Sequence, residues 1–377
     1  MCSLNNDKFV ITKTAFVCDE SYFWHNSGGG ALFEQGKFIE ELEPIENPLS
    51  KRRVKNLLER SGLMRKLVQI YPEMASDEQL KWFHTKEYID LVRTLSDGAG
   101  GLCGDATHVG QGSFEIAKMS VGGAIAAVKA VVKDDDIASA YALTRPPGHH
   151  AQADSGAGFC IFNNAVIAAK YAQKELGVKK IAIIDWDAHH GNGVEDAFYE
   201  DDTVLFVSLH QEGYDPVDRG LHTDNGKGKG KGFNINIPLP AGSGDAVYAY
   251  AFEQIVSPAV KKFAPELIIV CAGQDANFFD PLARMMVTTE GYRQITRAVK
   301  ELCTKVVCLH EGGYCPTYVP FCTHAIIEEL SNIKTEVTDP YLESMAGTAY
   351  NKLLPHQKER IDSIKTHLEG ENGLDKK

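Results

Sequence analysis

The sequence predicts an α/β fold in which helices cover both faces of a central parallel sheet. Strand-like and helix-like runs alternate through most of the chain, which is typical of this class. The 377 residues are 44% hydrophobic and 24% charged, so the chain can bury a sizeable core. Four of the predicted strands also end directly in a polar loop, as expected where a parallel sheet carries a functional site.

The predicted elements follow one another without a break. Short apolar or β-branched runs predict strands, and longer amphipathic runs predict helices. The predicted strands are Ile137–Leu143, Lys180–Ile184, Val204–Leu209, Phe233–Ile237, Leu267–Ala272 and Val306–His310, and the predicted helices are Val54–Arg60, Asn163–Leu176, Asp245–Phe263 and Glu290–Cys303. Because no internal repeat or Pro/Ser-rich linker interrupts them, we expect one domain over residues 1–377. An N-terminal segment, 1–65, and a helical tail, 335–377, belong to it.

The charge, the apolar runs and the cysteines indicate which partners and which compartment to expect. The net charge of −12 argues against direct nucleic-acid binding, which needs a basic face. The N-terminus is too polar for a signal peptide, and no apolar run approaches the ~20 residues of a membrane span. The nine cysteines are odd in number and include no CxxC pair, which favours a reducing compartment. We therefore expect a cytoplasmic protein with no nucleic-acid or membrane partner.

The four polar loops indicate one active site. They comprise Arg145–His150, Asp185–Gly193, Gly273–Asp275 and Glu311–Tyr314, and each follows a predicted strand. Ligands of open parallel sheets bind outside the carboxyl ends of the strands. The loops are therefore expected to converge there.

The second loop indicates a metal site. The run Ile181–Ile184 predicts a buried strand, and Asp187 and His189 follow it two residues apart. In an extended segment such residues point to the same side. A carboxylate and an imidazole on one side form half of a hydrolytic metal site.

The motifs together resemble a known family. Arg-Pro-Pro-Gly-His-His, Asp-Trp-Asp-Ala-His-His-Gly-Asn-Gly, Ala-Gly-Gln-Asp-Ala and Glu-Gly-Gly-Tyr occur in the order found in zinc-dependent histone deacetylases. The chain most resembles the class II-like bacterial histone deacetylase-like amidohydrolases, over about residues 15–350 and including Phe23–Asn26 and Glu46–Gly62. The resemblance implies an arginase-like three-layer fold with a central eight-stranded parallel sheet. It also implies a hydrolase that removes acetyl or related acyl groups from lysine or a similar amine and is inhibited by hydroxamates.

The family's ligand positions imply one catalytic Zn²⁺ held by Asp187, His189 and Asp275. Three protein ligands leave a position for water or substrate, as a catalytic zinc requires. Two carboxylates and one imidazole also suit Fe²⁺ or Co²⁺, so the identity of the metal comes from the resemblance alone.

The resemblance also assigns catalytic roles. His149 and His150 match the tandem histidines that serve as general base and general acid, with their second ring nitrogens held by Asp185 and Asn192. Some members carry Asp at position 192, and a neutral amide there should leave His150 less basic. Tyr314 matches the donor to the oxyanion. Some class II relatives carry His there and are weak on acetyl-lysine, so Tyr favours deacetylase activity.

Substrate and potassium sites are implied in the same way. Gly158 and Phe159 match one wall of the acyl-lysine channel, Gly313 adjoins it, and Tyr214 is the best candidate for the second wall although its loop departs from the family's pattern. An inner K⁺ site would use Asp185, Asp187, His189, Ser208 and Leu209, and an outer one would use Phe198, Asp201, Val204 and Phe233.

Three alternatives stay open. An arginase-like binuclear manganese hydrolase needs a further Asp at position 191, which is Gly here. An acetylpolyamine amidohydrolase would use the same site on a smaller cationic substrate. A non-catalytic acyl-lysine binding protein should have lost a ligand or Tyr314. The bacterial relatives often assemble, which allows a homo-oligomer whose loops narrow a neighbouring entrance.

Overall fold

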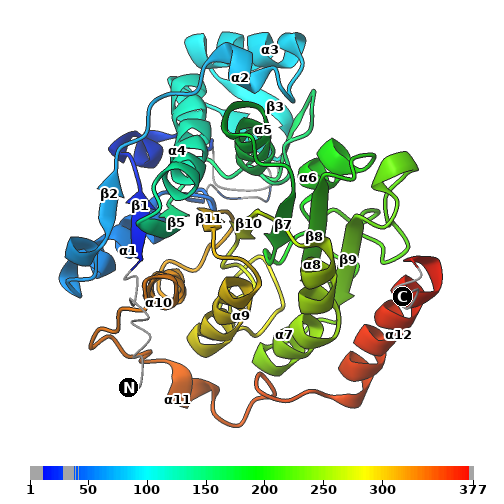
Figure 1. Cartoon of the computed structure of the whole chain (residues 1–377). Coiled ribbons are helices and arrows are strands. Elements are labelled where there is room, and N and C mark those ends of the chain that lie inside the picture. The colour runs from blue at the N-terminus through cyan, green and yellow to red at the C-terminus, as the bar shows by residue number, and fades with distance from the viewer. Residues whose placement is uncertain (1–11, 29–37, 39, 41, 373–377) are drawn as a thin grey trace, which may run out of the picture.

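A computed structural model of the chain describes residues 12–28, 38, 40 and 42–372. Parts of the predicted N-terminal segment and the last five residues of the predicted tail lie outside these ranges. The central sheet has eight strands, and all neighbouring strands are parallel (Figure 1). In spatial order they are β2 (Val68–Ile70), β1 (Lys13–Val17), β5 (Ile137–Ala142), β11 (Val306–His310), β10 (Leu267–Ala272), β7 (Ile181–Asp185), β8 (Val204–Gln211) and β9 (Asn234–Leu239). The predicted fold class is confirmed.

Helices cover both faces of the sheet. One layer contains α4 (Ser113–Lys133), α5 (Asn164–Leu176) and α6 (Asn192–Phe198), and the other contains α7 (Asp245–Ala251), the π-helical turn η4 (Phe252–Val256), α8 (Ser257–Phe263), α9 (Thr289–Leu302) and α10 (Val319–Ser331) (Figure 1). Helix α1 (Leu49–Arg60) packs against α10, and α12 (Pro355–Asn372) packs against α7 and β9. The predicted three-layer arrangement is therefore present.

Shorter elements surround these layers. A second sheet of three short strands contains β3 (Gly101–Asp105), β4 (Thr107–Val109) and β6 (Gly156–Ala157). The remaining helices are η1 (Glu20–Trp24), η2 (Met64–Lys66), α2 (Asp77–Leu80), α3 (Lys86–Asp97), η3 (Gly228–Gly230) and α11 (Leu342–Met345). No helix in the described part of the chain is long and apolar enough to cross a membrane.

The central strands are predominantly apolar because both of their faces are buried. In β7, Ile181 and Ile183 pack with α4 and α5, whereas Ala182 and Ile184 join the core beneath α7–α10. Such strands lack the alternation of a half-exposed strand, and the short apolar runs of the sequence are their signature.

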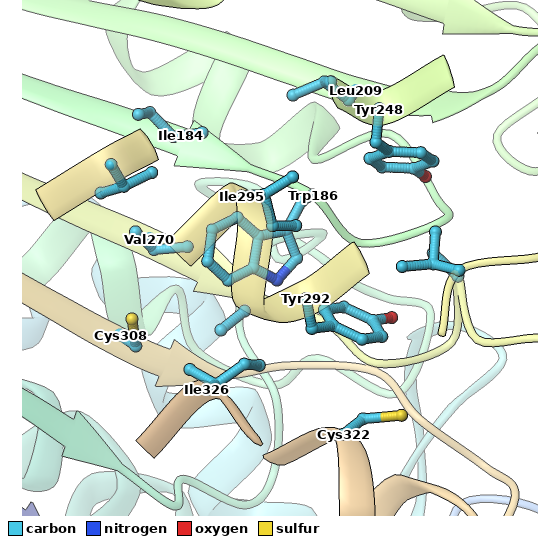
Figure 2. Close-up of a cluster of buried hydrophobic side chains, with 14 of the residues drawn as sticks. Ile184, Trp186, Leu209, Tyr248, Val270, Tyr292, Ile295, Cys308, Cys322 and Ile326 are labelled. Atoms are coloured by element: carbon cyan, nitrogen blue, oxygen red, sulfur yellow. The ribbon is translucent and has the colours of Figure 1, made fainter. Parts of the chain in front are cut away.

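Trp186 anchors the loop that follows β7. It lies between Asp185 and Asp187, but its fully buried indole points into the core beneath α9. Figure 2 shows the ring among Val270, Tyr292 and Ile295. Burial of this large ring fixes the backbone between two acidic residues that would otherwise repel each other.

We expect Trp186→Ala to destabilise the fold by roughly 3–5 kcal/mol, the range for truncating a buried large aromatic residue. Denaturant-induced unfolding measures this. Trp24→Ala is the control, because Trp24 is 71% exposed and its truncation should change stability by less than about 0.5 kcal/mol. Equal losses in the two variants would contradict an anchoring role for Trp186.

Candidate active site

The four polar loops meet at one edge of the sheet. They follow β5, β7, β10 and β11, which are consecutive neighbours in the order β5-β11-β10-β7. Parallel strands bring their carboxyl ends to the same edge, so loops far apart in sequence become adjacent.

The second and third loops supply a compact group of metal-ligating atoms. Asp187, His189 and Asp275 are buried, and one ligand atom of each lies within 4.8 Å of the others. His189 Nδ1 is 3.1 Å from Asp187 Oδ1 and 2.9 Å from Asp275 Oδ2. Backbone amides orient both carboxylates: Gly312 N–H donates to Asp187 Oδ2 at 2.9 Å, and Ala188 N–H donates to Asp275 Oδ1 at 2.8 Å.

The electrostatics of this group favour a bound cation. Asp185, Asp187 and Asp275 are fully buried within one site. Burial and the neighbouring Asp187 carboxylate raise the pKa of Asp275 to about 7. A divalent cation would relieve this repulsion, and two carboxylates with one imidazole form a suitable ligand set. The residues therefore fit a single metal ion.

Gly191 leaves no room for a second metal ligand. A Cβ atom at this position would lie 2.3 Å from Asp185 Oδ2, far inside van der Waals contact. A bridging carboxylate at position 191, which a binuclear site would need, cannot be placed without moving Asp185.

The tandem histidines have different partners. His149 Nδ1 lies 3.0 Å from Asp185 Oδ2, and His150 Nδ1 lies 2.8 Å from Asn192 Oδ1. Both partner oxygens accept hydrogen bonds, so each Nδ1 carries a proton. The Nε2 atom of neutral His150 is then free to accept a proton.

The two histidines also differ in charge. Burial opposes the charged form of His149, but the Asp187 and Asp185 carboxylates outweigh it and raise its pKa to about 10. Burial and the nearby His149 hold the pKa of His150 well below its ordinary value. His150 is therefore the neutral member of the pair.

The fully buried carboxylate of Glu311 holds the loop that carries the tandem histidines. Glu311 Oε2 accepts hydrogen bonds from the Gly148 amide at 2.6 Å and the His149 amide at 3.2 Å. Burial raises the pKa of Glu311 to about 7. Sequence reasoning missed this role of Glu311, because Glu311 and Gly148 are 163 positions apart.

A pocket of about 140 Å³ opens above these groups. It is lined by Ala106, His150, Gly158, Phe159, His189, Tyr214, Asp215, Leu282 and Tyr314. The Phe159 and Tyr314 rings meet edge to face with centroids 5.7 Å apart, and Tyr214 lies 5.6 Å from the His189 ring. Ala106 and Leu282 were missed because an isolated small or apolar residue carries no sequence signal.

The backbone brings Phe159 to this pocket. Gly158 and Phe159 both have positive φ, 50° and 68°. This region is strained for a non-glycine residue and is common at functional sites. A Cβ at Gly158 would lie 2.4 Å from His150, so only glycine fits beside that histidine.

The Tyr314 loop is held by a carboxylate from the segment that follows β10. Asp280 Oδ2 accepts hydrogen bonds from the Tyr314 amide at 2.8 Å and from the Cys315 amide at 3.3 Å. Gly313, beside it, has a φ of 137° that favours glycine and does not line the pocket.

The residues predicted for potassium lie beside the metal-ligand group and along β8. Ser208 is the register partner of Asp185, and Leu209 follows it. Phe198 ends α6, Asp201 lies between α6 and β8, Val204 begins β8, and Phe233 precedes β9. The Phe233 carbonyl accepts the Phe206 amide at 2.9 Å, and the Phe198 carbonyl accepts the Asp201 amide at 3.0 Å.

Comparison with known proteins places this geometry in a family. The histone deacetylase domain model matches residues 45–330. The chain belongs to the histone deacetylase family. It is 42% identical over 340 residues to a histone deacetylase-like amidohydrolase of Pseudomonas aeruginosa, covering 88% of this chain and 89% of that protein. A probable deacetylase of Archaeoglobus fulgidus is 37% identical over 309 residues, covering 80% and 85%.

A solved structure has the same fold. The crystal structure of the HDA15 HD domain superposes with a TM-score of 0.85 at 28% identity, covering 97% of this chain and 96% of that one. Membership of the histone deacetylase family, with its amidohydrolase relatives, makes this chain a hydrolase that acts on amides.

Proposed function

We propose that this histone deacetylase family member is a zinc-dependent deacylase that removes acetyl or related acyl groups from the ε-amine of lysine. The observation that carries the proposal is one pocket lined by the ligand His189, the neutral His150, Tyr314 and the aromatic ring of Phe159. These are the groups that amide hydrolysis needs, and they line one pocket of about 140 Å³.

Asp187, His189 and Asp275 would hold one Zn²⁺. When bound, this ion polarises the acyl carbonyl and acidifies water. The ligand residues themselves are fixed by backbone amides and by the buried Trp186, so the site is organised before substrate arrives.

The resemblance divides the proton transfers between His149 as general base and His150 as general acid, whereas we assign both to His150. It accepts the proton of the attacking water and returns it to the leaving amine. Its Nδ1–H bond to Asn192 leaves Nε2 unprotonated, and its lowered pKa keeps it neutral at physiological pH. His149 is paired with Asp185 through Nδ1, and its ring lies beside that of His150 with centroids 4.0 Å apart. Tyr314 donates a hydrogen bond to the oxyanion as it forms.

The acyl-lysine stem would lie between Phe159 and Tyr214, whose rings line the pocket. Flat aromatic walls bury a methylene chain without demanding a particular polar group. We also propose K⁺ at the inner and outer sites predicted above, because Asp185 and Ser208 face each other across β7 and β8 and because carbonyl oxygens suit K⁺.

Replacing Asn192 by Asp should move the acidic limb of the pH–rate profile to higher pH. His150 must be neutral to take a proton, and a carboxylate at position 192 would stabilise its charged form and raise its pKa by roughly one to three units. Activity below the new pKa is then lost. The profile of kcat/KM against pH measures the shift, and an unmoved limb would show that His150 is not the base.

A substrate panel tests the proposed function. The zinc-loaded protein is assayed on an acetyl-lysine peptide, a trifluoroacetyl-lysine peptide and N-acetylputrescine, each with and without a hydroxamate. Hydroxamate-sensitive turnover of the lysine peptides is expected. Preference for N-acetylputrescine would contradict the lysine substrate and favour the acetylpolyamine alternative, and binding without turnover would favour a binding protein.

A further inference from the structure

Three buried charged residues lie beside the Tyr314 loop, and the mechanism above does not use them. Glu46, Lys51 and Arg145 are each no more than 1% exposed. Arg145 binds both oxygens of Glu46 at 2.9 Å, and Lys51 Nζ lies 3.4 Å from Glu46 Oε1. Burying a charge costs folding free energy unless the charge is paired, so three buried charges in one place indicate a specific role.

The group carries an excess positive charge. Burial alone would raise the pKa of Glu46, but Arg145 and Lys51 lower it to about 2, so Glu46 is ionised. Arg145 already satisfies Glu46 and also donates to the backbone oxygens of Tyr22 and His25. Lys51 and Arg145 thus share one carboxylate. Burial lowers the pKa of Lys51, and the Glu46 and Asp280 carboxylates oppose that effect and favour its charged form. Within the described residues, the Glu46 contact is the one ion pair of Lys51, and it is long.

The ammonium of Lys51 faces the tyrosine of the active site. Its Nζ lies 5.7 Å from the centroid of the Tyr314 ring. Its neighbours on α1 hold the same loop on both sides of the tyrosine: Ser50 Oγ donates to the Gly313 carbonyl at 3.2 Å, and Arg53 Nε donates to the Pro316 carbonyl at 2.8 Å. The first turns of α1 therefore pack against the Tyr314 loop.

We propose that Lys51 is a positioning residue for Tyr314, held by Glu46 against the ring so that it orients the phenol and strengthens its O–H as a hydrogen-bond donor. A cation near the ring is attracted to its electron density and favours the more acidic phenol that an oxyanion donor needs. This inference rests on the proposed role of Tyr314.

Lys51→Met tests it, since Met keeps the length of the side chain and removes the charge. We expect kcat on an acetyl-lysine peptide to fall roughly tenfold, within the range of a desolvated cation–π contact. KM and zinc content should stay unchanged. Lys55→Met is the matched control. Lys55 lies on the same helix, with its Nζ 5.9 Å from the centroid of the Phe23 ring, but it is 38% exposed and contacts Phe23 and Glu20 in place of Tyr314.

A double-mutant cycle with Tyr314→Phe decides the mechanism. If Lys51 acts through the phenol, Lys51→Met should have no further effect on the single-turnover rate of Tyr314→Phe. An equal fold loss in both backgrounds would overturn the inference and leave Lys51 a structural ion pair. If Lys51→Met does not fold, Lys51→Gln, whose amide can still donate to Glu46, carries the same test. Full activity in Tyr314→Phe alone would instead overturn the proposed role of Tyr314.

Discussion

Tyr314→Phe is expected to lower kcat on an acetyl-lysine peptide by roughly 10²–10³-fold, the loss typical of removing one oxyanion donor. The substitution removes a single oxygen, so the edge-to-face contact with Phe159 and the backbone bonds to Asp280 remain. Zinc content and substrate KM should therefore change little. Steady-state kinetics with metal analysis on the same preparation measure both quantities.

Tyr250→Phe provides the control for this variant. Tyr250 hydrogen-bonds Asp362 of α12, away from the active-site loops, so its loss should leave turnover unchanged. Full activity in Tyr314→Phe would show that another group donates to the oxyanion.

Asp187→Ala is expected to abolish turnover and to release the metal. Asp187 supplies one ligand oxygen and also accepts the Gly312 and His189 amides, so its loss removes a ligand and loosens two ligand loops. Loss of a residue that only hydrogen-bonds a metal ligand typically costs about 10–100-fold in metal affinity, and loss of a ligand itself should cost more. Metal content after dialysis, measured beside acetate release, tests this expectation.

Asp90→Ala is the matched control, because Asp90 lies on α3 in a surface ion pair with Lys86. It should retain both metal and activity. One equivalent of zinc retained by Asp187→Ala would show that the ligand is wrongly assigned.

The sequence predicted the loops of the site because a parallel sheet gathers the carboxyl ends of its strands. The strands Leu267–Ala272 and Val306–His310 match β10 and β11, and the other predicted strands differ from the observed ones by at most two residues at either end. The predicted helix Asp245–Phe263 is present as the contiguous α7, η4 and α8. The predicted helix Val54–Arg60 begins earlier, at Leu49. These strands could be predicted because a short apolar run is itself typical of a buried strand.

The features that the sequence could not predict depend on contacts between residues that are far apart in the chain. The three-residue β2 is too short for a periodic pattern, and the buried pair of Arg145 and Glu46 joins positions 99 apart in sequence. Lys51 lies in a basic cluster that a sequence alone assigns to an exposed helix face. Only the packing of α1 against the Tyr314 loop shows that this lysine is buried while Lys55 remains exposed.

Titration of the metal-free protein with Zn²⁺, while acetate release from an acetyl-lysine peptide is recorded, tests the central claim most directly. Activity should rise linearly to one equivalent per chain and then level off, because Asp187, His189 and Asp275 form the ligand group that reaches the pocket through His189, and Gly191 supplies no bridging carboxylate. Activity that requires two equivalents, or tight zinc binding with no acetate release, would contradict a mononuclear zinc deacylase.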